Sequence, residues 1–133
     1  MGSVFEKLNL AKRQELVVLH APESFAPELA RLPALTIHRH LESVAGADFW
    51  LAFVTRKSEL DKLAPQIARR AKGDAIVWFA YPKGTSKKYT CDFNRDTGWD
   101  MLKKAGFDTV RAVAIDADWT ALRFRRKEFI KRS

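Results

Sequence analysis

The feature that most constrains this chain is an unbroken apolar run from Ala75 to Tyr81, which leads into the loop sequence Pro-Lys-Gly-Thr-Ser at 82–86. A run of this length, rich in β-branched and aromatic residues and without polar alternation, is typical of a strand buried on both faces of a parallel sheet. Ligands of open α/β sheets gather outside the carboxyl ends of the strands. We therefore expect a site in the loop that follows this run.

Shorter apolar and amphipathic segments predict the remaining elements. Strands are expected at 15–19, 35–38, 49–54, 109–115 and 119–124, with helices at 25–32, 58–72 and 94–104. The middle helix starts with a sequence that resembles a capping box, Ser58 to Asp61, and Lys72-Gly73 closes it. Pro65 lies within this helix and predicts a kink or a break after Leu63.

Strands alternate with helices along the chain, which predicts right-handed parallel crossovers and a sheet covered by helices. The last two strands are joined by a connection too short for a crossover, so the last strand must be antiparallel. The predicted fold class is α/β, a three-layer sandwich with a mostly parallel sheet of about six strands. We expect a single domain, residues 1–133, with a lead-in segment at 1–13 and a basic tail at 126–133 that frays.

The expected location follows from what the sequence lacks. No apolar run approaches the roughly 20 residues needed to span a bilayer, and the first residues lack the apolar centre of a signal peptide. A cytoplasmic protein without a membrane partner is therefore expected. Cys91 is the only cysteine, which excludes an intrachain disulfide and fits a reducing compartment.

The chain is strongly basic, with 24 Lys and Arg against 16 Asp and Glu and a formal net charge of +8. Clustered cations displace counterions from phosphates, so one interpretation is a nucleic-acid partner bound through the loop 83–88 and the tail 123–132. The other is a solvated surface that keeps the protein soluble. The scatter of the remaining charges favours this second interpretation.

Four motifs extend over nearly the whole chain. They are Ala-Pro-Glu-Ser-Phe at 21–25, Phe-Val at 53–54, Trp-x-x-Tyr-Pro-Lys-x-x-Ser at 78–86 and Ile-Asp-x-x-Trp-x-x-Leu-Arg-Phe at 115–124. Together they resemble a family of small bacterial proteins known only as a domain of unknown function. This resemblance implies no activity, no cofactor and no site residue.

A more distant resemblance concerns the fold. The run 48–82, followed by a helix and a hairpin, is similar to the second half of a class I methyltransferase of Rossmann type. This resemblance implies a shortened sheet with the strand order 2-1-3-4-6-5 and an antiparallel last strand. That family binds its nucleoside cofactor on a glycine-rich turn after the first strand, whereas the turn here, His20 to Ser24, has no glycine. Cofactor binding in the usual manner is not expected, and the cofactor stays unknown.

The candidate ligand-binding residues follow two neighbouring strands. The loop after the central strand contributes Lys83, Gly84, Thr85 and Ser86. Their ammonium, backbone N–H and hydroxyl groups suit a phosphate or a carboxylate, although an ordinary turn is the alternative, because the P-loop spacing is absent. After the preceding strand, Arg56 forms a fork for the same anion and Ser58 starts a helix whose positive end adds to it. Simple helix capping by Ser58 is the alternative.

Asp116 and Trp119 complete the predicted site from the terminal hairpin. Asp116 faces the same edge of the sheet if it ends its strand, but aspartate is also favoured in such turns for its hydrogen bonds to the backbone. Trp119 is a candidate for stacking on a ligand ring. The other tryptophans, Trp50, Trp78 and Trp99, are expected in the core.

Histidine and cysteine chemistry receives little support. His38 and His40 are two residues apart, which places both imidazoles on one face of a strand, but no third ligand is evident and no metal site is expected. His20 is the remaining histidine. Cys91 is a nucleophile only if a histidine lowers its pKa, and none is near in the sequence.

The function expected from these residues is a non-enzymatic or degenerate domain. It binds a small anionic ligand, phosphate- or nucleotide-like, at the carboxyl ends of the strands. Two alternatives stay open: a basic nucleic-acid-binding module, which is not favoured, and a small enzyme with Asp116 or Asp92 as its general base. The apolar content permits a homodimer as well as a monomer.

Overall fold

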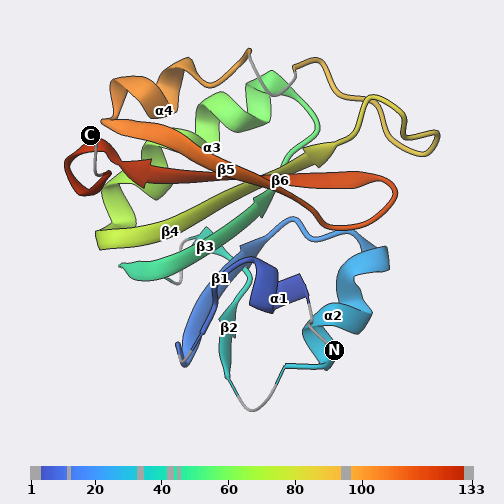
Figure 1. The fold of residues 1–133 in the computed structure, drawn as a ribbon, viewed down its shortest axis with the longest axis horizontal. Coiled ribbons are helices and arrows are strands. Elements are labelled where there is room, and N and C mark those ends of the chain that lie inside the picture. The colour runs from blue at the N-terminus through green and yellow to red at the C-terminus, as the bar shows by residue number, and fades with distance from the viewer. Residues whose placement is uncertain are drawn as a thin grey trace.

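The computed structural model of the chain describes residues 4–11, 13–32, 35–41, 44, 46–93 and 97–130. Within them the helices are α1 (Val4–Lys7), α2 (Ala26–Ala30), α3 (Lys57–Arg70) and α4 (Asp100–Lys104), with 3-10 turns at Glu23–Phe25 and Lys127–Phe129. The strands are β1 (Glu15–Leu19), β2 (Thr36–His38), β3 (Ala47–Phe53), β4 (Ala71–Pro82), β5 (Phe107–Ala114) and β6 (Trp119–Arg126). Figure 1 shows how the helices lie around the one twisted sheet that the strands form.

The six strands form one sheet in the order β2-β1-β3-β4-β6-β5, which confirms the predicted order. The first four strands pair in parallel, whereas β6 pairs antiparallel with both β4 and β5. The register of β4 and β6 places Trp119 opposite Pro82 and Phe124 opposite Val77. The predicted α/β class, with helices on the sheet and an antiparallel last strand, is confirmed.

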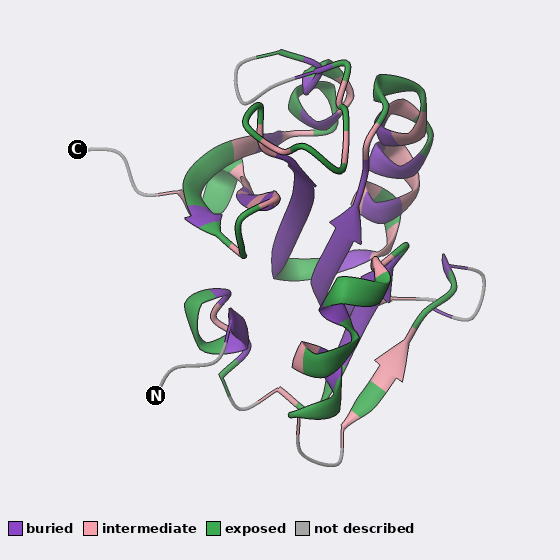
Figure 2. Cartoon of the chain, turned by 90° about the vertical axis from the view of Figure 1, so that its right-hand side faces the viewer, coloured by how far each residue is buried: buried purple, intermediate pink, exposed green. Residues whose placement is uncertain are grey.

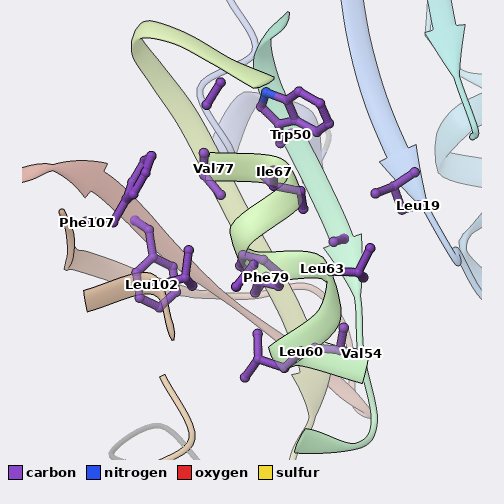
Figure 3. Packing of buried hydrophobic residues seen from close by; sticks show 14 of the residues in the cluster. Leu19, Trp50, Val54, Leu60, Leu63, Ile67, Val77, Phe79, Leu102 and Phe107 are labelled. Atoms are coloured by element: carbon purple, nitrogen blue, oxygen red, sulfur yellow. The ribbon is translucent and has the colours of Figure 1, made fainter. Parts of the chain in front are cut away.

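The two faces of the sheet carry separate cores, because β3 and β4 are apolar on both sides. On one face, Leu60 and Ile67 of α3 and Leu102 of α4 pack against the sheet (Figure 3). On the other face, Phe5 of α1 and Leu29 of α2 do the same. Figure 2 shows the buried central strands between these layers. The core positions expected for three tryptophans are confirmed, with exposures of 0%, 0% and 3% for Trp50, Trp78 and Trp99.

α3 starts one residue before the predicted position. Its N-cap residue is Arg56, and Glu59 at the third helical position accepts a hydrogen bond from the Arg56 N–H at 3.1 Å. The predicted cap by Ser58 is wrong, because a glutamate at this position reaches back to the donors that precede the helix. Pro65 lies inside α3 without breaking it. The buried face of the helix, which includes Leu63, holds it against the sheet on both sides of the proline.

β4 starts earlier than predicted. Lys72 and Gly73 belong to the strand and do not close the helix, which ends at Arg70. The register with β3 shifts in this region, and Gly73 has a positive φ of 51°. The Arg126 guanidinium donates to the Ala71 carbonyl oxygen at 2.8 Å, which ties the end of β6 to the start of β4.

Of the helix predicted at 94–104, the structure shows Asp100–Lys104 as α4, and residues 94–96 lie outside the described residues. Gly98 has a φ of 96°, which a helix excludes, so the helix starts after Trp99. Gly106 has a φ of 93° and follows the helix, as predicted. The helix predicted at 25–32 is a 3-10 turn followed by the short α2, and Pro33 lies outside the described residues.

Both ends of the described chain contact the sheet. The Trp78 indole N–H donates to the Leu8 carbonyl oxygen at 2.8 Å, which docks the lead-in segment on β4. The Lys127 N–H donates to the Gly106 carbonyl oxygen at 2.9 Å, so the described part of the basic tail, to residue 130, is hydrogen-bonded to the body. Among the described residues, every helix is too short or too polar to cross a membrane.

Candidate functional site

The chain changes its direction of winding between β1 and β3. From β1 it passes to β2 on one side, and then returns to β3 on the other side of β1. Open α/β sheets bind ligands at such a switch point, outside the carboxyl ends of the two strands. Here these ends are Leu19-His20 and Phe53 to Thr55. The strand order therefore favours a site beside β1 and β3, one strand away from the loop after β4.

A groove of about 520 Å³ opens next to this position, on the β1 side of the switch point. Its walls come from the carboxyl end of β1, the segment after β2 and the first turns of α3. The residues that line it are Leu19, His20, Arg39, His40, Leu41, Glu59, Lys62, Leu63 and Gln66. Pockets for small molecules typically occupy about 300–1,000 Å³. We call this cavity the switch-point groove.

His20 has a left-handed backbone conformation, with a φ of 58°, directly after β1. This conformation costs roughly 1–2 kcal/mol for a residue with a Cβ and persists where the surroundings enforce it, often at functional sites. Glycines adopt it readily in the turns that follow the first strand of other Rossmann sheets. His20 therefore adopts the conformation that a glycine adopts in such turns, and it lines the groove.

Glu59 connects the wall of the groove to the end of β3. Its Oε1 atom accepts hydrogen bonds from the Thr55 N–H, the Thr55 hydroxyl and the Arg56 N–H, each at 3.1 Å. Burial acts to raise the pKa of Glu59, but these hydrogen bonds and the electrostatic interaction with His20 outweigh it, so the pKa is lowered. Glu59 is therefore a carboxylate at neutral pH. Among the described residues it is the only acidic one that lines the groove.

The histidines are divided between two environments. His20 and His40 line the switch-point groove. His38 instead contacts Glu15, with 2.7 Å between Nε2 and Oε2. In the described parts of the chain, no three His, Cys, Asp or Glu side chains are grouped as a metal site requires.

The predicted ligand-binding residues surround a second region, the segment 89–92. One depression of about 460 Å³ is lined by Thr55, Arg56 and 88–92. Another of about 550 Å³ is lined by 81–84, 86, 89–93 and 97. The structure therefore brings Arg56, Lys83, Gly84 and Ser86 to two sides of one segment. Ser58 and Thr85 are exposed and line neither depression.

Internal hydrogen bonds hold the loop 82–86. The Lys83 N–H donates to the Asp118 carbonyl oxygen at 2.8 Å. The Ser86 hydroxyl donates to the Asp118 carboxylate at 2.9 Å and accepts the Tyr89 N–H at 3.2 Å. A Cβ at Gly84 would meet nothing within 4 Å, so no close approach requires a glycine there. These contacts fit the alternative interpretation of the loop as an ordinary turn.

The hairpin residues of the predicted site also have structural partners. Asp116 Oδ1 accepts the N–H groups of Asp118 and Trp119 at 2.8 and 2.9 Å. Trp119 is 3% exposed and packs against Phe53 and Tyr89, with ring centroids 5.1 and 4.9 Å away. The indole is enclosed and is not open to a ligand in this structure. A binding role for the residues around this loop stays a prediction.

Two further candidates have clear surroundings. Asp92 Oδ1 accepts the Lys57 N–H at 2.6 Å, so the carboxylate caps the start of α3. Cys91 is half-buried, and burial raises the pKa of its thiol. The thiol is therefore protonated at neutral pH and is not an activated nucleophile.

Sequence reasoning did not identify the switch-point groove, whose polar lining includes His20, Arg39 and Glu59. The signal was present in the predicted strand order, because the order 2-1-3-4-6-5 itself places a switch point between the first and third strands. The long apolar run of β4 directed attention to the end of β4 and away from the ends of β1 and β3. His20 gave no local signal, since a positive φ is uncommon for a residue other than glycine.

Several solved structures with a similar fold are described as methyltransferases. The structure is similar to that of the magnesium protoporphyrin IX methyltransferase of Synechocystis PCC 6803 with bound S-adenosylhomocysteine (TM-score 0.59, 12% identity). The match covers 93% of this chain and 78% of that one. It is also similar to phosphoethanolamine N-methyltransferase 2 of Haemonchus contortus (TM-score 0.59, 12% identity, 95% and 38% covered). A third is the ribosomal protein L11 methylase of Lactobacillus delbrueckii subsp. bulgaricus (TM-score 0.54, 17% identity, 95% and 66% covered). The chain thus spans between about two fifths and four fifths of these proteins.

No protein-family model and no curated protein sequence matches this chain. Several of the similar structures contain S-adenosylhomocysteine or S-adenosylmethionine. This finding contradicts the expected non-enzymatic domain for an anionic ligand, an expectation that rested on the composition of the loop 82–86. At these identities the likeness concerns the fold: the chain has the Rossmann-like fold of class I methyltransferases in a shortened form.

Proposed function

We propose that this chain is a methyltransferase-like domain that binds an S-adenosyl compound in the switch-point groove. The observation that carries the proposal is the position of the groove. It opens at the carboxyl ends of β1 and β2 and against α3, in a sheet whose strand order and antiparallel β6 match the methyltransferase fold. Ligands of this sheet type bind at the switch point.

The residues of the groove fit such a compound. Its volume is sufficient for a nucleoside joined to an amino acid. Arg39 and Lys62 provide cations for the carboxylate of the methionine part, whereas Glu59 and Gln66 provide acceptors for its ammonium group and for ribose hydroxyls. His20 provides the backbone turn after β1.

The groove also differs from the usual glycine-rich site. Pro22, two residues after His20, has no N–H to donate to a ligand. The segment after β2 carries Arg39 and His40 where a dinucleotide-binding Rossmann sheet has an acidic residue for the ribose. Side chains of α3 therefore take over contacts that the backbone of the β1 turn makes elsewhere.

When S-adenosylmethionine is bound, it supplies a methyl group on a sulfonium centre for transfer to a nucleophile. The chain's own residues bind this compound and orient it. Glu59 keeps the end of β3 in place through Thr55, and the apolar side chains of Leu19, Leu41 and Leu63 exclude water from the base of the groove.

Isothermal titration calorimetry of the full chain with S-adenosylhomocysteine tests this proposal. Loss of a charge-assisted hydrogen bond costs about 1.5–3 kcal/mol, so Arg39→Gln is expected to weaken binding at least about tenfold. Lys103→Gln, an exposed lysine of α4 outside the groove, is the matched control and keeps wild-type affinity. Absence of binding by the wild type, or equal binding by both variants, contradicts the proposal.

Membership of the uncharacterised bacterial family and a cytoplasmic location go with this proposal as predictions. The single-domain boundary at 1–133 and the choice between monomer and homodimer also stay predictions. Size-exclusion chromatography with light scattering measures the oligomeric state directly.

A further inference from the structure

One face of β6 is apolar near the start of the strand and basic further along it. Near its start, Trp119 and Ala121 are buried in the core that α1 covers. Side chains alternate along a strand, so Arg123 and Arg125 lie further along this same face. Arg111 of β5 lies directly opposite Arg123. Three arginines therefore occupy neighbouring positions of the hairpin.

This part of the hairpin is far from the switch-point groove along the strands. Arg123 pairs with Trp78 in the middle of β4, and Arg125 contacts Asp74 near the amino end of that strand. The groove opens at the opposite, carboxyl edge of the sheet. A fourth arginine, Arg13, lies in the segment before β1 and contacts Asp48 near the amino end of β3.

Two of the four arginines have acidic partners. The Arg125 Nε atom donates to the Asp74 carboxylate at 2.7 Å. The Arg13 Nε atom lies 3.4 Å from the Asp48 carboxylate. Burial and the positive charges of Arg125, Arg111 and Arg13 lower the pKa of Arg123, and Asp74 acts in the opposite direction.

Arg111 and Arg123 have no ion pair among the described residues. The Arg123 Nε atom is buried and has no hydrogen-bond partner there. Like charges directly opposite one another on adjacent strands destabilise a sheet, and a buried donor without a partner adds to the cost. The arrangement therefore opposes folding, and an anion from outside the chain relieves both costs.

We propose that Arg13, Arg111, Arg123 and Arg125 form a docking surface for the phosphodiester backbone of a nucleic acid. The planar guanidinium group binds phosphate oxygens in pairs, and all four residues are arginines. Arg123 and Arg125 are two residues apart on a strand, about 7 Å, which suits a polymer with repeating charges. The net charge of +8 attracts such a polymer from a distance.

This surface is separate from the basic loop 83–88 and from the groove, so the inference does not depend on the proposed function. An anionic membrane is the less favoured partner, because membrane surfaces bind cations that are flanked by large apolar side chains. Among the described residues, only Val110 and Phe129 are large, apolar and exposed.

Fluorescence anisotropy of the full chain with a fluorescein-labelled single-stranded RNA, and with DNA of the same sequence, tests the inference. The double variant Arg111→Gln, Arg123→Gln is expected to lose at least about tenfold in affinity at 0.1 M salt. The slope of log K against log salt is expected to fall by about 1.4, because each single-strand phosphate contact contributes about 0.7. The matched control, Lys103→Gln with Lys104→Gln on α4, removes the same charge and stays within about twofold of the wild type.

Three results overturn the inference: equal losses in the two double variants, a loss confined to Lys87→Gln with Lys88→Gln, or binding to phosphatidylserine vesicles without binding to oligonucleotides.

The melting temperature of the arginine double variant is expected to equal or exceed that of the wild type, since a like-charge pair is removed. If that variant does not fold, Arg111→Gln alone, at an exposed position, gives the same comparison. S-adenosylhomocysteine binding is expected to be unchanged in every variant, which separates this test from that of the groove.

Discussion

Glu59 and Thr55 are joined twice at the start of α3, because the Glu59 Oε1 atom accepts both the Thr55 N–H and the Thr55 hydroxyl at 3.1 Å. These bonds fix the carboxyl end of β3 to the helix that forms one wall of the switch-point groove. The same carboxylate therefore stabilises the helix start and shapes the site.

The Glu59 connection predicts a pH-dependent stability difference. The folded protein lowers the pKa of Glu59, so the ionised carboxylate contributes stability above its unfolded pKa of about 4.5, and this stability is lost as the pH falls through the folded pKa. We expect Glu59→Gln to lower the melting temperature at pH 7, by an amount equivalent to about 0.3–1 kcal/mol, because the Gln amide oxygen still accepts these bonds but the negative charge at the helix N-terminus is lost. The difference is expected to disappear in acid, and a difference that is constant with pH contradicts this role.

The strained backbone of His20 leads us to expect that one substitution stabilises the fold and weakens ligand binding. His20→Gly removes the cost of a positive φ and is expected to stabilise the fold by up to about 1 kcal/mol. It also removes an imidazole from the groove, so the affinity for S-adenosylhomocysteine is expected to fall. Urea unfolding and calorimetry measure the two effects. A variant that is less stable than the wild type shows that the turn is not strained.

Gly98 and Gly106 form a matched pair, because both have a φ near 95° but differ in their surroundings. A Cβ at Gly98 meets the Phe93 Cβ at 2.8 Å, whereas a Cβ at Gly106 meets nothing within 4 Å. We expect Gly106→Ala to cost about 1 kcal/mol from backbone strain and Gly98→Ala to cost about 1–3 kcal/mol more from overpacking. Equal losses in urea unfolding contradict the observed packing of Phe93.

The ion pair of Asp74 and Arg125 is expected to contribute little to stability. Both side chains are about one third exposed, so water screens their attraction. A double-mutant cycle with Asp74→Asn and Arg125→Gln is expected to give a coupling of about 0.2–1 kcal/mol. Arg125 lowers the pKa of Asp74, so the coupling is present at neutral pH and is lost as the pH falls through the folded pKa. A coupling that is equally large at low pH contradicts this assignment.

The sheet was predictable because its signals are local. The apolar runs of β1, β3 and β4 are buried on both faces, and the short turn at 116–118 forces β6 to run antiparallel. Helix starts were harder to predict. Ser58 resembles a cap by residue type, but Glu59 and Asp92 satisfy the first N–H groups of α3, and the contribution of Asp92 comes from a distant segment of the chain.

The candidate site was predictable only in part, because it depends on the arrangement of strands. Ser86 and Asp116 have residue types that suit a ligand, yet both hydrogen-bond within their own turns. The lining of the groove comes from three segments, near His20, Arg39 and Glu59, which meet only once the sheet has formed. Local composition could not reveal that juxtaposition, although the predicted strand order could.

The most direct test of the account is an NMR titration of the ¹⁵N-labelled chain with S-adenosylhomocysteine. If the switch-point groove binds the compound, the amide signals of His20, Arg39 and Glu59 shift, whereas those of the loop 83–88 stay in place. If the compound shifts no signal, or shifts only signals of the loop 83–88 and of Arg56, the proposed site is wrong.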